Sequence, residues 1–170
     1  MDDAKNYYSD GVARVLKLLK DTFGDTFKEY YDDEPIDIPE SRLPCIMVKE
    51  TTGGVRSGAA GTDDIGEEIV IIVAMNTKDD LGASTDSDLT GSKLRRIVKG
   101  QYPPGHAREK EYQDETVMAV IRKNFTLEDA IIDNFVRTDF DLNQRGDTTY
   151  TKEAYVTLTI ERLAHVPSRT

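Results

Sequence analysis

Residues 67–75 read Glu-Glu-Ile-Val-Ile-Ile-Val-Ala-Met, and they include the longest uninterrupted apolar run of the chain, from Ile69 to Met75. A run this rich in branched aliphatic residues is typical of a buried strand. It is far shorter than the roughly 20 apolar residues that a membrane-spanning helix needs. We therefore expect a strand here, inside a folded domain.

A glycine-rich stretch joins this strand to the one before it. The earlier strand is Cys45-Ile46-Met47-Val48, and Pro44 marks its beginning. Residues 51–66 lie between the two strands, contain five glycines and offer little that could be buried. Because strands flank this stretch on both sides, we predict a long hairpin loop here. Loops of this length are uncommon in compact domains and tend to be functional or disordered.

This loop has two interpretations that the sequence does not separate. One is disorder in the isolated chain. The other is an assembly loop that becomes ordered against a neighbouring molecule, since a flexible segment with a few anchoring side chains often folds on binding. The residues of this assembly loop are Gly53, Gly54, Val55, Arg56, Gly58, Gly61 and Ile65.

Two segments outside these strands have the apolar periodicity of a helix. Residues 5–22 place one apolar stripe on one side, and Gly24 follows where a helix commonly ends. Residues 89–99 repeat the pattern, and we expect Thr90 or Asp88 to cap the first turn.

Polar segments connect the elements. We expect exposed connections at residues 32–39, 76–88 and 101–113, and the last of these contains Pro103-Pro104-Gly105. Residues 115–124 fit either a helix or a strand.

The last third of the chain predicts an antiparallel hairpin. Residues 131–142 and 152–164 resemble strands, and a turn cluster at 143–147 separates them. In the second strand one face can be buried, and it carries Val156, Leu158 and Ile160. The order of elements predicts an α+β fold in a single domain over residues 1–170: a mostly antiparallel sheet packed against two or three helices, with a long Gly-rich hairpin loop.

Composition and charge narrow the class of protein. Apolar residues make up 38% and charged residues 32%, which is typical of a soluble globular domain. The net charge is −10, from 9 basic and 20 acidic residues in 1–90 and 13 basic and 12 acidic residues in 91–170. An acidic surface repels phosphate, so we expect no tight binding of DNA or RNA, although an acidic wall would let DNA pass without sticking.

The chain also lacks signals for export. It begins Met1-Asp2-Asp3, without a basic region followed by an apolar one, and no stretch could serve as a membrane anchor. Cys45 is the only cysteine, so no internal disulfide can form. We expect synthesis in a reducing cytoplasm and no membrane partner.

No group of residues predicts a catalytic or metal centre. Residues 86–91, Asp-Ser-Asp-Leu-Thr-Gly, match the front half of a calcium loop, but position twelve is Ile97 where a glutamate is needed. His106 and His165 have no second ligand at zinc spacing. Paired acidic residues lack organised spacing, and we expect solvated charge at Asp32, Asp33, Glu34, Asp63, Asp64, Glu67, Glu68, Asp79 and Asp80.

Two further motifs have plain interpretations. Cys45 lies inside an apolar strand and is expected to pack in the core. Gly91-Ser92-Lys93 lacks the rest of a phosphate-binding loop, and a solvated helix surface accounts for Lys93, Arg95, Arg96 and Lys99. We therefore expect no enzyme activity, no catalytic residue, no cofactor and no metal; a metal-dependent hydrolase is the alternative among enzymes.

The layout as a whole resembles the tail terminator proteins of long-tailed bacteriophages and the related neck, or head–tail joining, proteins. The matching parts are the N-terminal helix, the Leu43-Pro44-Cys45-Ile46-Met47-Val48 strand, the long loop to Gly66, the helix near residues 89–99 and the closing strand at 155–163. The chain departs from the pattern by the extra polar segment at residues 101–113.

The resemblance implies a structural virion protein without catalysis. It implies a homo-oligomeric ring, typically a hexamer, that caps the tail tube, binds the tail tube protein and the head-side connector, and lets DNA pass. Other neck components, such as a stopper or a head completion protein, fit the same pattern. A monomeric protein-binding module is the alternative of a different class.

Overall fold

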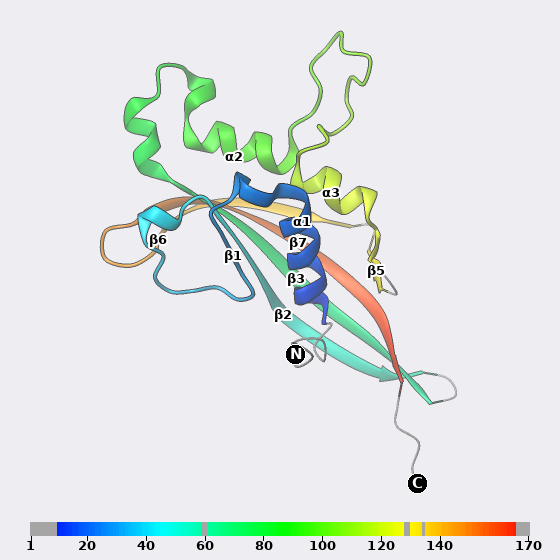
Figure 1. The fold of residues 1–170 in the computed structure, drawn as a ribbon. Coiled ribbons are helices and arrows are strands. Elements are labelled where there is room, and N and C mark those ends of the chain that lie inside the picture. Colours follow the sequence, from blue (N-terminus) through cyan, green and yellow to red (C-terminus); the bar gives the residue numbers. More distant parts are fainter. Residues whose placement is uncertain (1–9, 59–60, 128–129, 134, 166–170) are drawn as a thin grey trace.

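The computed structural model describes residues 10–58, 61–127, 130–133 and 135–165. The described residues form an α+β fold in which helices pack on a curled, mostly antiparallel sheet (Figure 1). The helices are α1 Gly11–Phe23, α2 Thr90–Lys99 and α3 Val117–Lys123, with 3₁₀ turns at Gly24–Thr26, Glu40–Arg42, Thr77–Gly82 and Asp86–Asp88. The strands are β1 Glu29–Tyr31, β2 Cys45–Ser57, β3 Thr62–Asn76, β4 Thr126–Leu127, β5 Ala130–Ile132, β6 Arg137–Gln144 and β7 Tyr150–His165.

The sheet is built around β3 and β7. The strand order is β1-β2-β3-β7-β5-β4, and β6 also pairs with β7, beside its N-terminal half. β3 pairs along its whole length with β7 and along most of it with β2. The predicted strand at residues 67–75 is therefore confirmed, and among the described pairings only that of β1 with β2 is parallel. The predicted terminal hairpin is confirmed for β6 and β7, but the single strand expected at residues 131–142 is wrong, because β5 and β6 are separate strands that pair with different parts of β7.

The first helix follows its apolar stripe. Its buried residues include Val12, Val15 and Leu19. Asp10 caps its start by accepting a hydrogen bond from the Ala13 N–H at 2.8 Å, and Gly24 at φ +48° follows its last residue. The predicted helix is confirmed from Gly11 onward, and residues 5–9 lie outside the described part of the chain.

The second helix is confirmed, but its expected cap is wrong. Neither Thr90 nor Asp88 caps it with a side chain. Instead the Thr90 N–H donates to Asp80 Oδ1 at 2.5 Å, and Asp88 accepts hydrogen bonds from the Ser84 and Thr85 hydroxyls. The 3₁₀ turn at Thr77–Gly82 brings this carboxylate back from ten residues upstream, a distance at which local spacing gives no signal.

The remaining connections agree with expectation only in part: the exposed connection expected at residues 32–39 is wrong for Ile38, which is fully buried, and residues 76–88 contain two 3₁₀ turns. Residues 115–124 contain a helix, α3, which Thr116 caps by accepting from the Ala119 N–H at 3.2 Å. Residues 101–113 form the expected loop, apart from one bridge between Gln101 and Tyr112. None of the described helices has the length and apolar character that crossing a membrane would require.

The two faces of the sheet carry separate cores. The helix face packs against α1, α2 and α3, and β7 contributes Val156, Leu158 and Ile160 to it, as predicted. The open face is partly covered by the segment between β1 and β2. This smaller core buries Cys45, as expected, together with Ile38, Leu43, Met47, Val70, Ile72 and Ala74.

The long hairpin loop expected at residues 51–66 is not confirmed, and the structure corrects it. β2 continues to Ser57 and β3 begins at Thr62, so most of the glycine-rich stretch forms paired strands. A short turn remains, in which the Gly58 N–H donates to the Thr62 carbonyl at 2.9 Å and Gly61 has φ +81°. Ala59 and Ala60 lie outside the described residues. Main-chain pairing of β3 with both neighbours holds this stretch extended, without needing side chains to bury.

Candidate functional site

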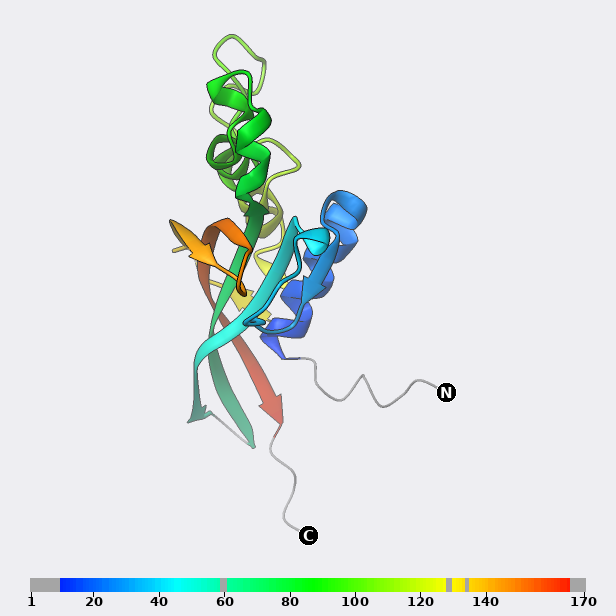
Figure 2. The same ribbon diagram turned by 90° about the vertical axis from the view of Figure 1, so that its left-hand side faces the viewer.

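The far ends of three strands extend beyond the helices and form a ribbon (Figures 1 and 2). We define the ribbon as residues 52–57 of β2, 62–68 of β3 and 159–165 of β7, which pair in register. All described β2 residues from Glu50 to Ser57 are exposed. The ribbon therefore presents an ordered surface that the domain does not cover.

The ribbon brings together the residues of the predicted assembly loop. Gly53, Gly54, Val55 and Arg56 lie on β2, Ile65 lies opposite Val55 on β3, and the turn contributes Gly58 and Gly61. Their part in assembly stays a prediction. Their setting differs from the expected one, because they belong to paired strands.

One edge of the ribbon is unpaired. β1 pairs with β2 only at residues 45–47, and a bulge at Thr51 interrupts the register with β3. Within the described part of the chain, no strand pairs with the outer side of residues 52–57. Such an edge exposes main-chain N–H and C=O groups that can pair with another strand, and most proteins protect it.

Side-chain direction divides the ribbon between the two faces. Glu67 points to the helix face, where it meets α1, so Ile65 and its partner Val55 share that face. Asp64 and its partner Arg56 then point to the open face, where their charged groups lie 3.6 Å apart.

A hollow of about 670 Å³ lies over the ribbon on the open face. Gly54 and Gly66 stand opposite each other, and a Cβ added at either would meet no atom within 4 Å. Ile131 and Leu163, each 57% exposed, line the hollow beside Arg56 and Glu161. The hollow therefore combines apolar side chains with both signs of charge.

Glu67 fastens the base of the ribbon to the first helix. Glu67 is 4% exposed, and its carboxylate accepts the Gly11 N–H at 2.9 Å and pairs with Arg162 Nη2 at 2.8 Å. A Cβ at Gly11 would lie 2.5 Å from this carboxylate, so any larger residue there would have to displace Glu67 from the helix start. The expectation of solvated charge is wrong for Glu67, because the helix start and Arg162 bury it.

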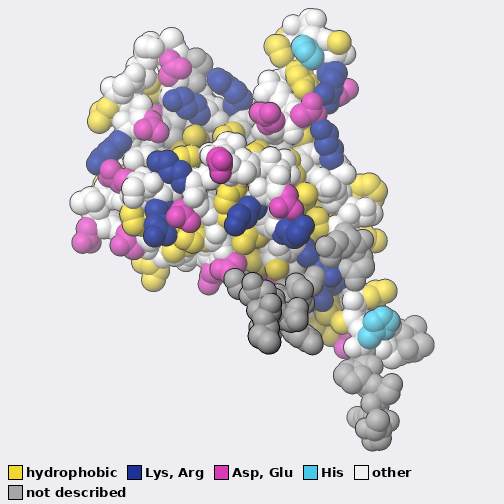
Figure 3. Space-filling model, viewed as in Figure 1, with side chains coloured by type: hydrophobic (Ala, Val, Ile, Leu, Met, Phe, Trp, Pro, Cys, Tyr) yellow, Lys and Arg dark blue, Asp and Glu magenta, His cyan; other side chains and the backbone are white. Residues whose placement is uncertain are grey.

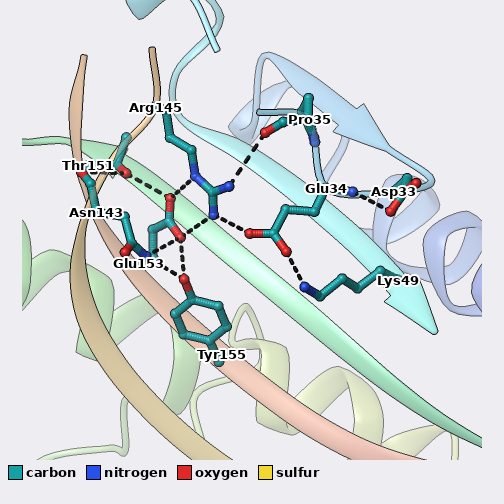
Figure 4. Close-up of polar contacts among 9 residues, drawn as sticks. All are labelled: Asp33, Glu34, Pro35, Lys49, Asn143, Arg145, Thr151, Glu153 and Tyr155. Carbon is teal, nitrogen blue, oxygen red and sulfur yellow. Dashed lines mark hydrogen bonds and ion pairs between the residues drawn. The ribbon is translucent and has the colours of Figure 1, made fainter. Parts of the chain in front are cut away.

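A second polar centre lies on the open face, at the opposite end of β7 (Figure 4). Glu153 is fully buried, and Arg145 grips both of its oxygens, at 2.7 Å through Nε and 2.6 Å through Nη2. It also accepts hydrogen bonds from Thr151, Tyr155 and Asn143. Every acceptor site of this carboxylate is therefore in use.

Glu34 connects this centre to the segment between β1 and β2. It accepts from Arg145 Nη2 at 2.6 Å and pairs with Lys49 of β2. Arg145 also reaches the Pro35 carbonyl at 3.4 Å. The expectation of solvated charge is therefore wrong for Glu34 too, because its carboxylate joins three distant segments across the open face.

The titration of these groups reflects their burial and their partners. Burial alone would raise the pKa of Glu153, but hydrogen bonds from Arg145, Tyr155 and Thr151 outweigh it and lower the pKa. Burial and the hydrogen bond to Glu153 raise the pKa of Tyr155. Burial, with the charge of Glu153, raises the pKa of the Cys45 thiol to about 12, so it is protonated at neutral pH. This cluster is suited to holding segments together.

The other candidate residues are not gathered into a site. Asp80 pairs with Lys152 at 2.7 Å, and hydrogen bonds from Lys152 and Thr90 lower its pKa to about 2. His106 stacks on Tyr102 in the 101–113 loop, and His165 ends β7. Over the described ranges, no three metal-ligating side chains come together.

Charge is mixed on the side of the molecule that bears α1. Figure 3 shows basic and acidic side chains interspersed there, without a broad area of one sign. The basic residues of α2 contribute to this mixture, and Lys99 lies over the Phe140 ring at 5.2 Å.

No protein-family model and no curated protein matches this chain. Its function therefore has to be argued from the geometry of the ribbon and from the layout of the chain.

Proposed function

We propose that the protein is a structural component that assembles with copies of itself through the ribbon, as a ring in the tail or neck of a long-tailed bacteriophage. The resemblance of the chain to tail terminator and neck proteins supplies the class. The observation that carries the proposal is the ribbon: three paired strands that leave the domain, with one edge unpaired and apolar side chains exposed.

Exposed apolar side chains on and beside the ribbon support an interaction with another protein molecule. On the helix face of the ribbon Val55 is 67% exposed, and on the open face Ile131 and Leu163 are each 57% exposed, although all three stand on ordered strands. Exposed apolar side chains that line one hollow, as Ile131 and Leu163 do, commonly mark an interaction site on a soluble protein. Because the strands are already paired, binding through them costs less conformational entropy than ordering a loop would.

The proposed ring would cap the tail tube and bind the tail tube protein on one side and the head-side connector on the other. Six copies are the number that the resemblance implies. With a net charge of −10 per copy, the ring would let DNA pass without holding it. A stopper or a head completion protein would use the same kind of copy-to-copy contact.

The test is the mass of the protein in solution. Sedimentation velocity and native mass spectrometry of the full chain should show a closed oligomer whose population grows with concentration. Val55→Asp places a charge on the ribbon and should reduce the oligomer at least tenfold. Leu81→Asp is the matched control, because Leu81 is 90% exposed on a 3₁₀ turn outside the ribbon.

A different outcome would favour the alternative class. If the wild-type chain is monomeric at every concentration, the ring is wrong and a monomeric protein-binding module is the better description. If both aspartate variants weaken the oligomer equally, assembly does not depend on the ribbon.

A further inference from the structure

Within the proposed function, the geometry points to the occupant of the free ribbon edge: strand β6 of a second copy, paired antiparallel so that the sheet continues from one molecule to the next. The inference rests on the proposed self-assembly and adds which edges meet, and in which register.

The sheet has a second free edge that suits this contact. Among the described strands β6 pairs with β7 alone, and most of its residues are exposed. Phe140 and Leu142 are 38% and 59% exposed on it. A head-to-tail contact between two different edges repeats from copy to copy, as a ring requires.

The directions of the two strands agree with such a contact. β2 is antiparallel to β3, β3 to β7, and β7 to β6, so β2 and β6 run in opposite directions within one molecule. When a second copy adds to the edge of β2 with its faces in the same sense, its β6 therefore lies antiparallel to β2.

Exposed apolar side chains of β6 and of β2 both lie on the helix face of the sheet. Phe140 lies opposite Ala154 and Leu142 opposite Lys152, which places both on the helix face, where Ala154 is in the core. Val55 belongs to the same face of the ribbon. Continuing the sheet thus brings the exposed Val55 beside exposed apolar side chains of the next copy.

On the open face, β6 carries acidic side chains and the edge of β2 carries a basic one. Asp139 and Asp141 lie opposite Tyr155 and Glu153 and so point to that face, as Arg56 does. Asp139 already pairs with Arg137 at 2.6 Å, whereas Asp141 has no ion pair within the described part of the chain. The Arg56 side chain is 86% exposed. The register that satisfies both faces sets Arg56 opposite Asp141 and Val55 opposite Leu142.

Cysteine cross-linking tests this register. In the variant Val55→Cys/Leu142→Cys, the two thiols of one chain are separated by three strand spacings, roughly 14 Å, and also by the length of β7 from Lys152 to Arg162, roughly 33 Å, which no disulfide can bridge. Thiols of adjacent copies would lie directly opposite. Mild oxidation should give a ladder of covalent multimers, and its highest band reports the number of copies in the ring.

Three controls make the result specific. Val55→Cys and Leu142→Cys alone should give no ladder, because each provides only one side of the contact. Arg56→Cys/Leu142→Cys should also give none, since its two thiols point to opposite faces of the continued sheet. Wild-type Cys45 is buried and should not cross-link.

Each other result overturns the inference. Covalent dimers from Val55→Cys alone would show that β2 pairs with β2 of a second copy. An oligomer that sediments normally but gives no ladder would refute this edge pairing and leave the proposed self-assembly intact. A chain that stays monomeric would refute both.

Discussion

At the scale of single residues, two buried carboxylates each tie separate segments of the molecule together. Glu153 and Glu67 each lie under the surface with an arginine and further donors around them. Among the described residues, no buried side-chain polar atom lacks a hydrogen-bond partner. Carboxylates with this many partners hold strands and segments in place. Removing one partner leaves a buried charge that neither water nor an opposite charge stabilises.

The Arg145–Glu153 pair should therefore be costly to break. Arg145→Met removes the bidentate partner of a fully buried carboxylate and should lower the free energy of unfolding by about 3–5 kcal/mol. The double variant Arg145→Met/Glu153→Leu should lose less, because it removes both charges. Urea unfolding of the two variants measures the difference, and an equal or greater loss in the double variant would contradict this reading.

The same carboxylate should make stability depend on acid. The pKa of Glu153 is lowered from 4.5 in the folded protein, so its contribution is present above that pH and is lost as the pH falls through the folded-state pKa. Glu153→Gln should be less stable at neutral pH and lose less stability on acidification. Unfolding free energies measured from neutral to acidic pH check this, and parallel curves for variant and wild type would refute it.

At the scale of elements, the sequence predicted a helix or strand correctly wherever buried apolar side chains form a regular pattern along the chain. The stripe of α1, the apolar run of β3 and the alternation of β7 all predicted the correct element. The part of the ribbon at residues 51–66 was missed because glycines, threonines and charged residues outnumber Val55 and Ile65 there, so the pairing leaves no apolar pattern. Gly54 opposite Gly66 has the composition of a loop and the conformation of a strand.

The start of α2 shows the same limit. Its cap is Asp80, which reaches the Thr90 N–H through a turn of the backbone. Asp80→Ala should lower the free energy of unfolding by about 1 kcal/mol, the usual value of an N-cap, with added loss of the Lys152 contact. Asp88→Ala, which removes one of the two caps expected from the sequence, should cost less. Thermal unfolding of both variants tests the assignment, and a larger loss for Asp88→Ala would reverse it.

At the scale of the whole molecule, the order of helices and strands was enough to predict an α+β fold with helices on a mostly antiparallel sheet. Only part of the candidate site could be predicted from the sequence. Val55, Arg56 and Ile65 were identified there. Ile131, Leu163 and Asp141 were not, because only the register of β5, β6 and β7 gives these residues their place on the sheet. Two edges far apart in the chain become complementary only after folding.

The most direct test of self-assembly through these edges is a charge exchange, read out as the oligomer's mass by sedimentation velocity. Arg56→Asp and Asp141→Arg each place like charges opposite each other in the contact, and we expect both to shift the protein toward monomer. The double variant Arg56→Asp/Asp141→Arg restores opposite charges between the copies and should recover the wild-type mass; the Arg56–Asp64 ion pair inside each molecule is lost equally in Arg56→Asp and in the double variant, so it does not separate the two. A double variant no better assembled than the single ones, with its fold intact by circular dichroism, would contradict the account.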